Sequence, residues 1–383
     1  MSTNPTGTLD LTGLELFDHH CHGVVADDLD REAFEALISE SSRPAPEGCT
    51  RFDTQVGFGI RRYCAPILGL PTFATADEYV KRRAELGADE VNRRLLAAAE
   101  LGTLGIETGH SPESITTPQE TADLAGASAY EIIRLERIAE NVAHDRLTRG
   151  LSSEGFFDEV TAEIDRRSVQ AIGVKSIAAY RIGLDFDAAR PSTAELASAA
   201  DTWFSSVPSV HPRLDDATII RGLIWHAIDR SHAIQLHIGY GDDDVDLHRC
   251  NPLLLTGLLR ATVDSGARFM LLHCYPFHRE AGYLADVFPH VYCDVGLAVN
   301  YTGSRSDAII AESLELTPFH KALFSTDAFG AAELYLLGAV LFRRGLAATL
   351  ETFMDIDGWP EAEARRVAGL IGRENAMRAY RLN

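Results

Sequence analysis

Short apolar runs alternate with longer amphipathic stretches along most of the chain. Eight of these runs have the length and residue types of β-strands, and the stretches between several of them are rich in the Ala, Leu, Arg and Glu of helices. The predicted strands are residues 14–23, 101–109, 130–136, 171–179, 233–238, 268–273, 290–295 and 321–327. Continuous rather than alternating apolar positions are typical of a parallel sheet with helices on both faces. The pattern therefore predicts an α/β fold, and eight strand–helix units would close a (β/α)8 TIM barrel.

A doubly wound open sheet is the alternative to the barrel. Its dinucleotide-binding form carries a Gly-x-Gly-x-x-Gly loop after the first strand, and no such loop follows residues 14–23. Polar residues also stand at the ends of many predicted strands, which is where barrel enzymes place their active sites. We therefore favour the barrel.

Residues 24–100 are too many for an ordinary strand–helix loop, so they predict an insertion that shapes the site. Its second half is expected to be helical, because Thr75 offers an N-cap and Asp77 and Glu78 are acidic first-turn residues. The other predicted helical stretches are residues 139–167, 193–231, 251–264 and the C-terminal part. We expect a single domain over residues 1–383, with the helical insertion at about 24–100.

The composition, with 46% hydrophobic and 24% charged residues, is that of an ordinary globular protein. A net charge of -21 without basic clusters argues against a nucleic-acid partner. The six cysteines show no paired spacing, which favours reduced thiols in a cytoplasmic protein. The sequence shows no signal-peptide pattern and no stretch long enough to span a membrane, so we expect no membrane partner. The partner that we expect is a small-molecule substrate.

Candidate metal ligands stand at the ends of several predicted strands. His20 and His22 are two residues apart on the first strand, so both imidazoles face the same side. The strand ends also carry Lys175, His237, His273 and Asp327. Each has a structural explanation when taken alone, but in a barrel all six side chains converge on one mouth. Imidazoles and a carboxylate suit Zn²⁺ and also accept Mn²⁺, Fe²⁺ or Ni²⁺.

This set resembles the amidohydrolase superfamily of metal-dependent hydrolases. His20-Cys21-His22 matches its His-x-His motif, and His237, His273 and Asp327 match its ligands or catalytic residues after strands five, six and eight. More narrowly, residues 175–184, 280–285 and 324–327 are similar to the amidohydrolase domain of FluG-type and nodulin-like proteins, where that domain is fused to a glutamine synthetase-like domain. No synthetase-like part follows the predicted barrel here. The resemblance implies a barrel of the metal-dependent hydrolase type.

In the predicted reaction Asp327 takes a proton from the attacking water, and His273 or the metal polarises the substrate carbonyl. Lys175 decides between one ion and two, since a strand-four lysine is carbamylated and bridges a second ion in several members of the superfamily. If Lys175 is unmodified, His20, His22, His237 and Asp327 would hold one ion and His273 would act as acid or base. Lys175 could instead bind a substrate carboxylate or pair with Asp294.

The loops after the strands supply candidate substrate contacts. Arg181 could bind a carboxylate bidentately, or it could form a surface ion pair. Tyr240 and Asp242 belong to an acidic loop that could bind an amine or could simply be solvated. The remaining histidines to which we assign structural roles are His19, His110, His144 and His211.

The function expected from the resemblance is metal-dependent hydrolysis of a small amide, and a γ-glutamyl-type amide is one candidate. A non-hydrolytic enzyme of the same fold, such as a decarboxylase, lactonase or isomerase, is the first alternative, because the fold alone does not separate them. A non-catalytic binding barrel is the second. Barrels of this kind commonly form homo-oligomers, which we also expect here.

Overall fold

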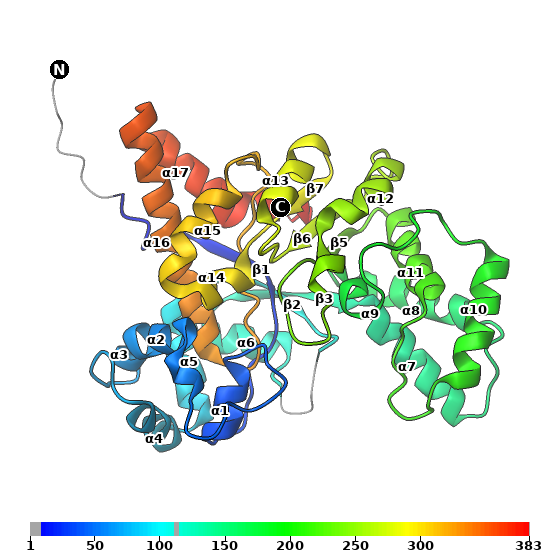
Figure 1. The fold of residues 1–383 in the computed structure, drawn as a ribbon, viewed down its shortest axis with the longest axis horizontal. Coiled ribbons are helices and arrows are strands. Elements are labelled where there is room, and N and C mark those ends of the chain that lie inside the picture. The colour runs from blue at the N-terminus through cyan, green and yellow to red at the C-terminus, as the bar shows by residue number, and fades with distance from the viewer. Residues whose placement is uncertain (1–8, 111–114, 383) are drawn as a thin grey trace.

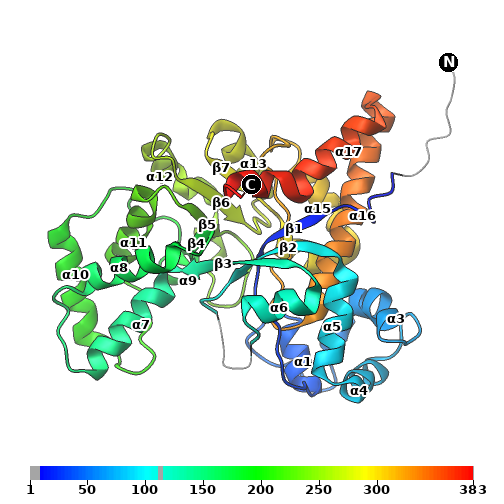
Figure 2. The same ribbon diagram turned by 180° about the vertical axis from the view of Figure 1, so that it is seen from behind.

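The computed structural model describes residues 9–110 and 115–382 (Figure 1). Seven parallel strands form one sheet in which each strand pairs with the one before it in the sequence. They are β1 (Leu16–Cys21), β2 (Leu101–Glu107), β3 (Ser128–Arg134), β4 (Gly173–Ser176), β5 (Ala233–His237), β6 (Arg268–Leu272) and β7 (Val291–Cys293). Figure 2 shows these strands between two groups of helices. The predicted α/β barrel architecture is confirmed.

The eighth predicted strand is an extended segment and not a regular strand. Leu323 N donates to Cys293 O of β7 at 2.9 Å, and on the other edge His19 N donates to Phe324 O at 3.1 Å. Further along, Asp327 N donates to His20 O at 3.0 Å. These bonds join β7 to β1 and close the ring. Asp327 has a φ of +51°, outside the β region, which explains why the ladder is irregular at this point.

Several predicted boundaries are wrong by a few residues. β3 begins and ends two residues earlier than predicted, and the predicted stretches 139–167 and 193–231 are each two helices. Gly155, with a φ of +76°, precedes the second helix of the first pair. The helices that follow β2 to β7 are α6 (Pro118–Ala125), α7 (Leu135–Thr148), α8 (Phe156–Ser168), α9 (Ala178–Arg181), α10 (Thr193–Ser206), α11 (Ala217–Asp229), α12 (Thr256–Ala261), α13 (His278–Val287), α14 (Gly296–Thr302) and α15 (Ser306–Ser313). The C-terminal helices are α16 (Ala332–Asp357), α17 (Glu361–Gly369) and α18 (Asn375–Ala379).

The segment between β1 and β2 is helical, as expected. It contains α1 (Arg31–Leu37), α2 (Gln55–Gly59), α3 (Ala65–Ile67), α4 (Ala76–Leu86) and α5 (Ala88–Ala99). The predicted cap of α4 is present, because Thr75 and Glu78 form a reciprocal capping box. α5 packs against α16, and Figure 1 shows both helices on the opposite side of the barrel from α7, α8, α10 and α11. None of the helices in the described ranges is long and apolar enough to cross a membrane.

Arg83 of α4 anchors this insertion to α16. Its guanidinium donates to Glu333, which also accepts a 2.8 Å hydrogen bond from Tyr79, and the Arg83 and Glu333 side chains are only 6% and 0% exposed. Replacing Arg83 by Met would leave the Glu333 charge buried without its partner. We expect Arg83→Met to lower the free energy of unfolding by about 3–5 kcal/mol.

Chemical denaturation measures this loss. Lys81→Met on the same helix is the matched control, because Lys81 is 78% exposed, and it should change stability by no more than about 0.5 kcal/mol. Equal stabilities for the two variants would contradict the anchoring role of Arg83.

Candidate metal centre

Asp327 lies among three histidines that come from two separate parts of the chain. Its Oδ1 atom is 3.0 Å from His20 Nε2 and 3.7 Å from His22 Nε2, and its Oδ2 atom is 3.4 Å from His273 Nε2. Ligand atoms of His20, His22 and Asp327 all lie within 4.8 Å of one another. β1 and the segment beside it therefore bring together three of the six predicted ligands in a group that could hold a metal ion.

The amide of Gln235 fixes the tautomer of His20. Gln235 Nε2 donates to the backbone oxygen of His19 at 2.8 Å, and that oxygen can only accept. Gln235 Oε1 is then the atom 2.7 Å from His20 Nδ1, so Nδ1 carries the proton. The Nε2 lone pair faces Asp327 and also Lys175 Nζ, which lies 3.1 Å away. The His20 Nε2 lone pair and the Asp327 carboxylate repel each other unless a cation lies close to both. The geometry therefore fits a metal ligand, in which Nε2 binds the ion and Gln235 holds Nδ1.

Glu107 at the end of β2 holds His22 in the same way. His22 Nδ1 lies 3.3 Å from the backbone oxygen of Glu107 and 3.4 Å from its carboxylate, both of which are acceptors. His22 Nε2 is therefore free to face Asp327. Burial alone would raise the pKa of Glu107, but the adjoining Arg134 guanidinium lowers that pKa to about 2. The carboxylate thus stays charged and keeps the imidazole oriented.

His237 and His273 complete a row of imidazoles. Their ring centroids are 5.0 Å apart, and that of His273 is 5.3 Å from that of His20. His237 Nε2 lies 3.4 Å from the backbone oxygen of Gly239, and its Nδ1 lies 3.3 Å from the Tyr180 hydroxyl, which can donate or accept, so either ring nitrogen could carry the proton. Both ring nitrogens of His273 are buried without a hydrogen-bond partner in the described parts of the chain. Such orphaned nitrogens indicate a missing partner, either an ion or a substrate.

Two of these residues have a backbone conformation that is uncommon outside glycine. His273 has a φ of +68° and Asp327 a φ of +51°. Residues held in the left-handed region cluster at functional sites, where the surrounding structure maintains them. For His273 this support includes its backbone N–H, which donates to Asp294 Oδ1 at 3.1 Å.

Comparisons with known proteins agree with this geometry. The family model described as "Amidohydrolase" matches residues 118–382. The chain belongs to the amidohydrolase family.

One relative is protein fluG of Emericella nidulans, which is 32% identical over 225 residues. The match covers 55% of this chain and 26% of fluG, so the chain spans about a quarter of the length of fluG. A solved structure from Lactobacillus casei, described as a metal-dependent hydrolase, is 28% identical with a TM-score of 0.84, and the match covers 98% of both chains. A uronate isomerase of Bacillus halodurans shares the fold at 14% identity and a TM-score of 0.66, over 97% of this chain and 94% of the isomerase. The resemblance seen in the sequence is confirmed.

Five of the six candidate ligands of this amidohydrolase lie along one cavity of about 480 Å³, and His20 lies behind them, 3.0 Å from Asp327. His22, Lys175, His237, His273 and Asp327 all contribute to its wall. Part of the wall comes from the insertion, including Glu40, whose pKa is raised to about 7 by burial. The expectation that residues 24–100 help to shape the site therefore agrees with the structure.

Not every predicted contact reaches the cavity. Asp242 lines it, but Tyr240 is one layer back, where its ring packs edge-on against the lining residue Tyr301 with centroids 5.6 Å apart. Arg181 also lines the cavity. Its ion pair with Glu140, at 3.1 Å, does not lie on the surface, because the Arg181 side chain is only 9% exposed. The alternative pairing of Lys175 with Asp294 is wrong.

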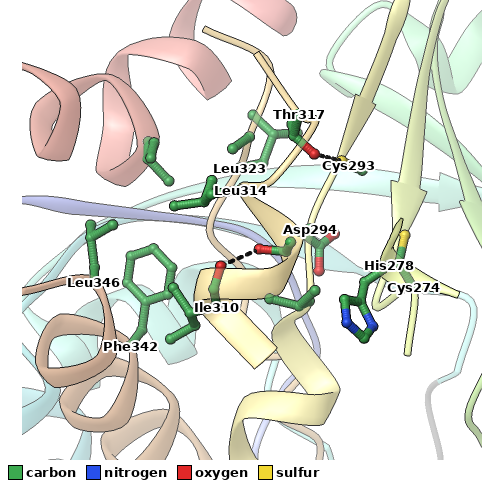
Figure 3. A pocket seen from close by; sticks show the side chains of 14 residues that line it. Cys274, His278, Cys293, Asp294, Ile310, Leu314, Thr317, Leu323, Phe342 and Leu346 are labelled. Carbon is green, nitrogen blue, oxygen red and sulfur yellow. Dashed lines mark hydrogen bonds between the residues drawn. The ribbon is translucent and has the colours of Figure 1, made fainter. Parts of the chain in front are cut away.

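Asp294 is instead held by His19 and by Ser325, at 3.0 Å and 2.7 Å. Burial would raise the pKa of Asp294, but the hydrogen bond and the charge of His19 keep that pKa far below its usual value. A second, enclosed cavity of about 20 Å³ borders Asp294 and is walled mainly by apolar side chains (Figure 3). It is too small for a substrate.

Among the histidines assigned structural roles, His110 lines the large cavity, with its ring centroid 6.2 Å from that of His22. His19 is buried beneath the site, where Nδ1 lies 2.9 Å from the Tyr380 hydroxyl, and His144 and His211 are exposed.

Sequence reasoning missed the residues that support the ligands. Gln235 stands two positions before His237 on the same face of β5, so the alternation that singled out His20 and His22 could have found it. Glu107 and Arg134 end their strands in the same way as the predicted ligands. Tyr180 carried no comparable signal.

Proposed function

We propose that this amidohydrolase is a metal-dependent hydrolase that cleaves a small amide, with a γ-glutamyl-type amide as the first candidate. The observation that carries the proposal is the arrangement of His20 and His22, whose Nδ1 atoms are held by Gln235 and Glu107 while both Nε2 atoms face Asp327. This is the arrangement expected of metal ligands. The similarity to a metal-dependent hydrolase over nearly the whole chain supports it.

Zinc is the ion we propose, because imidazole and carboxylate ligands suit it best, although Mn²⁺, Fe²⁺ and Ni²⁺ are chemically compatible. When bound, such an ion supplies a Lewis acid that lowers the pKa of a coordinated water molecule. His20, His22, His237 and Asp327 would hold it. Lys175, 3.1 Å from His20 Nε2, would join them as a ligand if carbamylated, and the site would then take two ions.

Asp327 and His273 divide the proton transfer and charge stabilisation between them. Asp327 Oδ2 accepts the proton of the attacking water and passes it to the leaving amine. His273 presents a ring nitrogen that has no partner among the described residues, and it donates to the substrate oxygen as negative charge develops there. The buried position of His273, 1% exposed, keeps competing water away from this contact.

The γ-glutamyl assignment rests on the similarity to fluG, which covers part of the chain. An isomerase is the alternative suggested by the uronate isomerases of the same fold, but that likeness is one of fold.

The direct test uses the enzyme reconstituted with Zn²⁺ or Mn²⁺ and a panel of γ-glutamyl amides, N-acyl amino acids, lactones and uronates. We expect release of amine from an amide, loss of that activity with a chelator, and its return with the metal. Metal analysis and the intact mass of the protein show whether one or two ions are bound and whether Lys175 carries an added carboxyl group. Turnover of a uronate or a lactone without any amide hydrolysis would overturn the proposal.

A further inference from the structure

Four arginines line the same cavity as the candidate metal ligands. They are Arg134, Arg137, Arg181 and Arg213. All four follow β3 or β4 in the chain or end β3, so they belong to one side of the barrel mouth. The protein as a whole carries a net charge of -21, so this local concentration of positive charge runs against its average composition. The carboxylate partners of each arginine therefore show whether its charge is neutralised within the protein or is available to a further anion.

Two of the four each have a carboxylate partner of their own. Arg134 pairs with the buried carboxylate of Glu107, which in turn holds His22, and only its Nε atom lacks a hydrogen-bond partner among the described residues. Arg213 pairs with Asp244 at 3.1 Å, and both side chains are about half exposed. Neither arrangement requires a further anion.

The other two share a single carboxylate. Glu140 lies 3.1 Å from Arg181 and 3.4 Å from Arg137, and it also accepts a 3.0 Å hydrogen bond from Leu214 N. The Arg181 side chain is only 9% exposed, and its Nε and Nη1 atoms have no hydrogen-bond partner within residues 9–110 and 115–382. Burying a guanidinium with unsatisfied donors is costly, so a second anion would stabilise this arrangement.

Glu136 is the nearest candidate for that second anion in the chain. It is fully buried, accepts from Ser176 Oγ at 2.6 Å and from Ile177 N at 3.0 Å, and forms no ion pair with the described arginines. Burial also raises its pKa, which disfavours the charged form. Glu136 therefore acts on Arg181 only from a distance and supplies neither Arg137 nor Arg181 with a second ion pair.

We propose that Arg181, with Arg137 beside it and Arg213 near it, forms a subsite for a carboxylate group of the substrate. This inference rests on the proposed amide hydrolysis and names its substrate class: an amide with a free carboxylate at a distance from the scissile bond. The planar fork of a guanidinium matches a carboxylate in two parallel hydrogen bonds. The cavity is shared with His22 and Asp327, so one substrate can contact both regions.

The test measures binding of glutarate, pentanoate and inorganic phosphate to the zinc-loaded enzyme by calorimetry, and hydrolysis of glutaramate against its neutral counterpart pentanamide. We expect glutarate to bind and Arg181→Gln to weaken that binding by about 10- to 100-fold. Arg181→Lys, which keeps the charge but not the fork, should lose less. Arg166→Gln is the matched control, because Arg166 is 70% exposed on α8 and far from the cavity lining.

In the kinetic arm, Arg181→Gln should raise KM for glutaramate by a larger factor than it changes KM for pentanamide. Equal glutarate binding by wild type and Arg181→Gln, or no glutarate binding at all, would overturn the subsite. Tighter binding of phosphate than of glutarate, lost in Arg181→Gln, would overturn the assignment to a carboxylate. If glutarate binding depends on Arg181 but no amide is hydrolysed, the subsite is supported and the proposed hydrolase activity is rejected. If pentanamide is hydrolysed but glutarate binding does not depend on Arg181, the hydrolase activity is supported and the subsite is rejected.

Discussion

The Asp327→Asn variant should keep its fold and lose about 10²- to 10⁴-fold in kcat on the amide that the enzyme hydrolyses. Asparagine has the size and shape of aspartate, but its amide cannot accept the proton of the attacking water. Asp327 also faces His20 at 3.0 Å and His273 at 3.4 Å, so the substitution removes the carboxylate at the centre of the imidazole cluster. Steady-state kinetics with metal content measured on the same samples tests the expectation.

Asp286→Asn is the matched control, because Asp286 is exposed on α13 outside the cavity lining and its loss changes the net charge equally. A variant that binds metal normally but is slow assigns the loss to proton transfer. Near-normal turnover by Asp327→Asn would remove Asp327 from the mechanism.

The second large effect is expected at His273. His273→Asn should lower kcat by about 10²- to 10³-fold, because it removes a buried donor aimed at the developing charge on the substrate oxygen. Asparagine is the appropriate replacement since His273 has a φ of +68°, and asparagine tolerates the left-handed region better than most residues. The measurement is kcat and KM for one amide, with KM expected to change little.

His144→Asn serves as the control, since His144 is exposed and outside the cavity lining. If the loss at His273 appears as a fall in metal content instead of kcat, then His273 is a ligand and not a donor to the substrate. An unchanged kcat with full metal content would contradict both roles.

Much of the fold could be predicted because parallel strands that are buried on both faces leave continuous apolar runs in the sequence. The eighth strand is the exception: residues 321–327 have the apolar pattern, yet Asp327 adopts a left-handed φ that no propensity scale indicates. The convergence of six polar strand ends could be predicted for the same reason, since all strands of a parallel barrel end at one mouth.

The supporting residues were harder to find. Gln235 and Glu107 are buried polar residues within strands, and only the tertiary fold shows that they hold His20 and His22. For Tyr240, the sequence gives a place on the loop after β5, but only the tertiary fold shows that its ring packs against Tyr301. Likewise, the carboxylate that Arg137 and Arg181 share depends on the tertiary fold, which brings Glu140 of α7 beside the end of α9.

The measurement that bears most directly on this account is the metal content of the wild type and of His22→Ala after reconstitution with Zn²⁺ and removal of free metal. We expect about one ion or more per chain in the wild type and a metal affinity lowered by at least about 10- to 100-fold in the variant, with its fold retained. A wild type that binds no divalent metal, or a His22→Ala variant that binds it as tightly as the wild type, would rule out a metal centre at His20, His22 and Asp327.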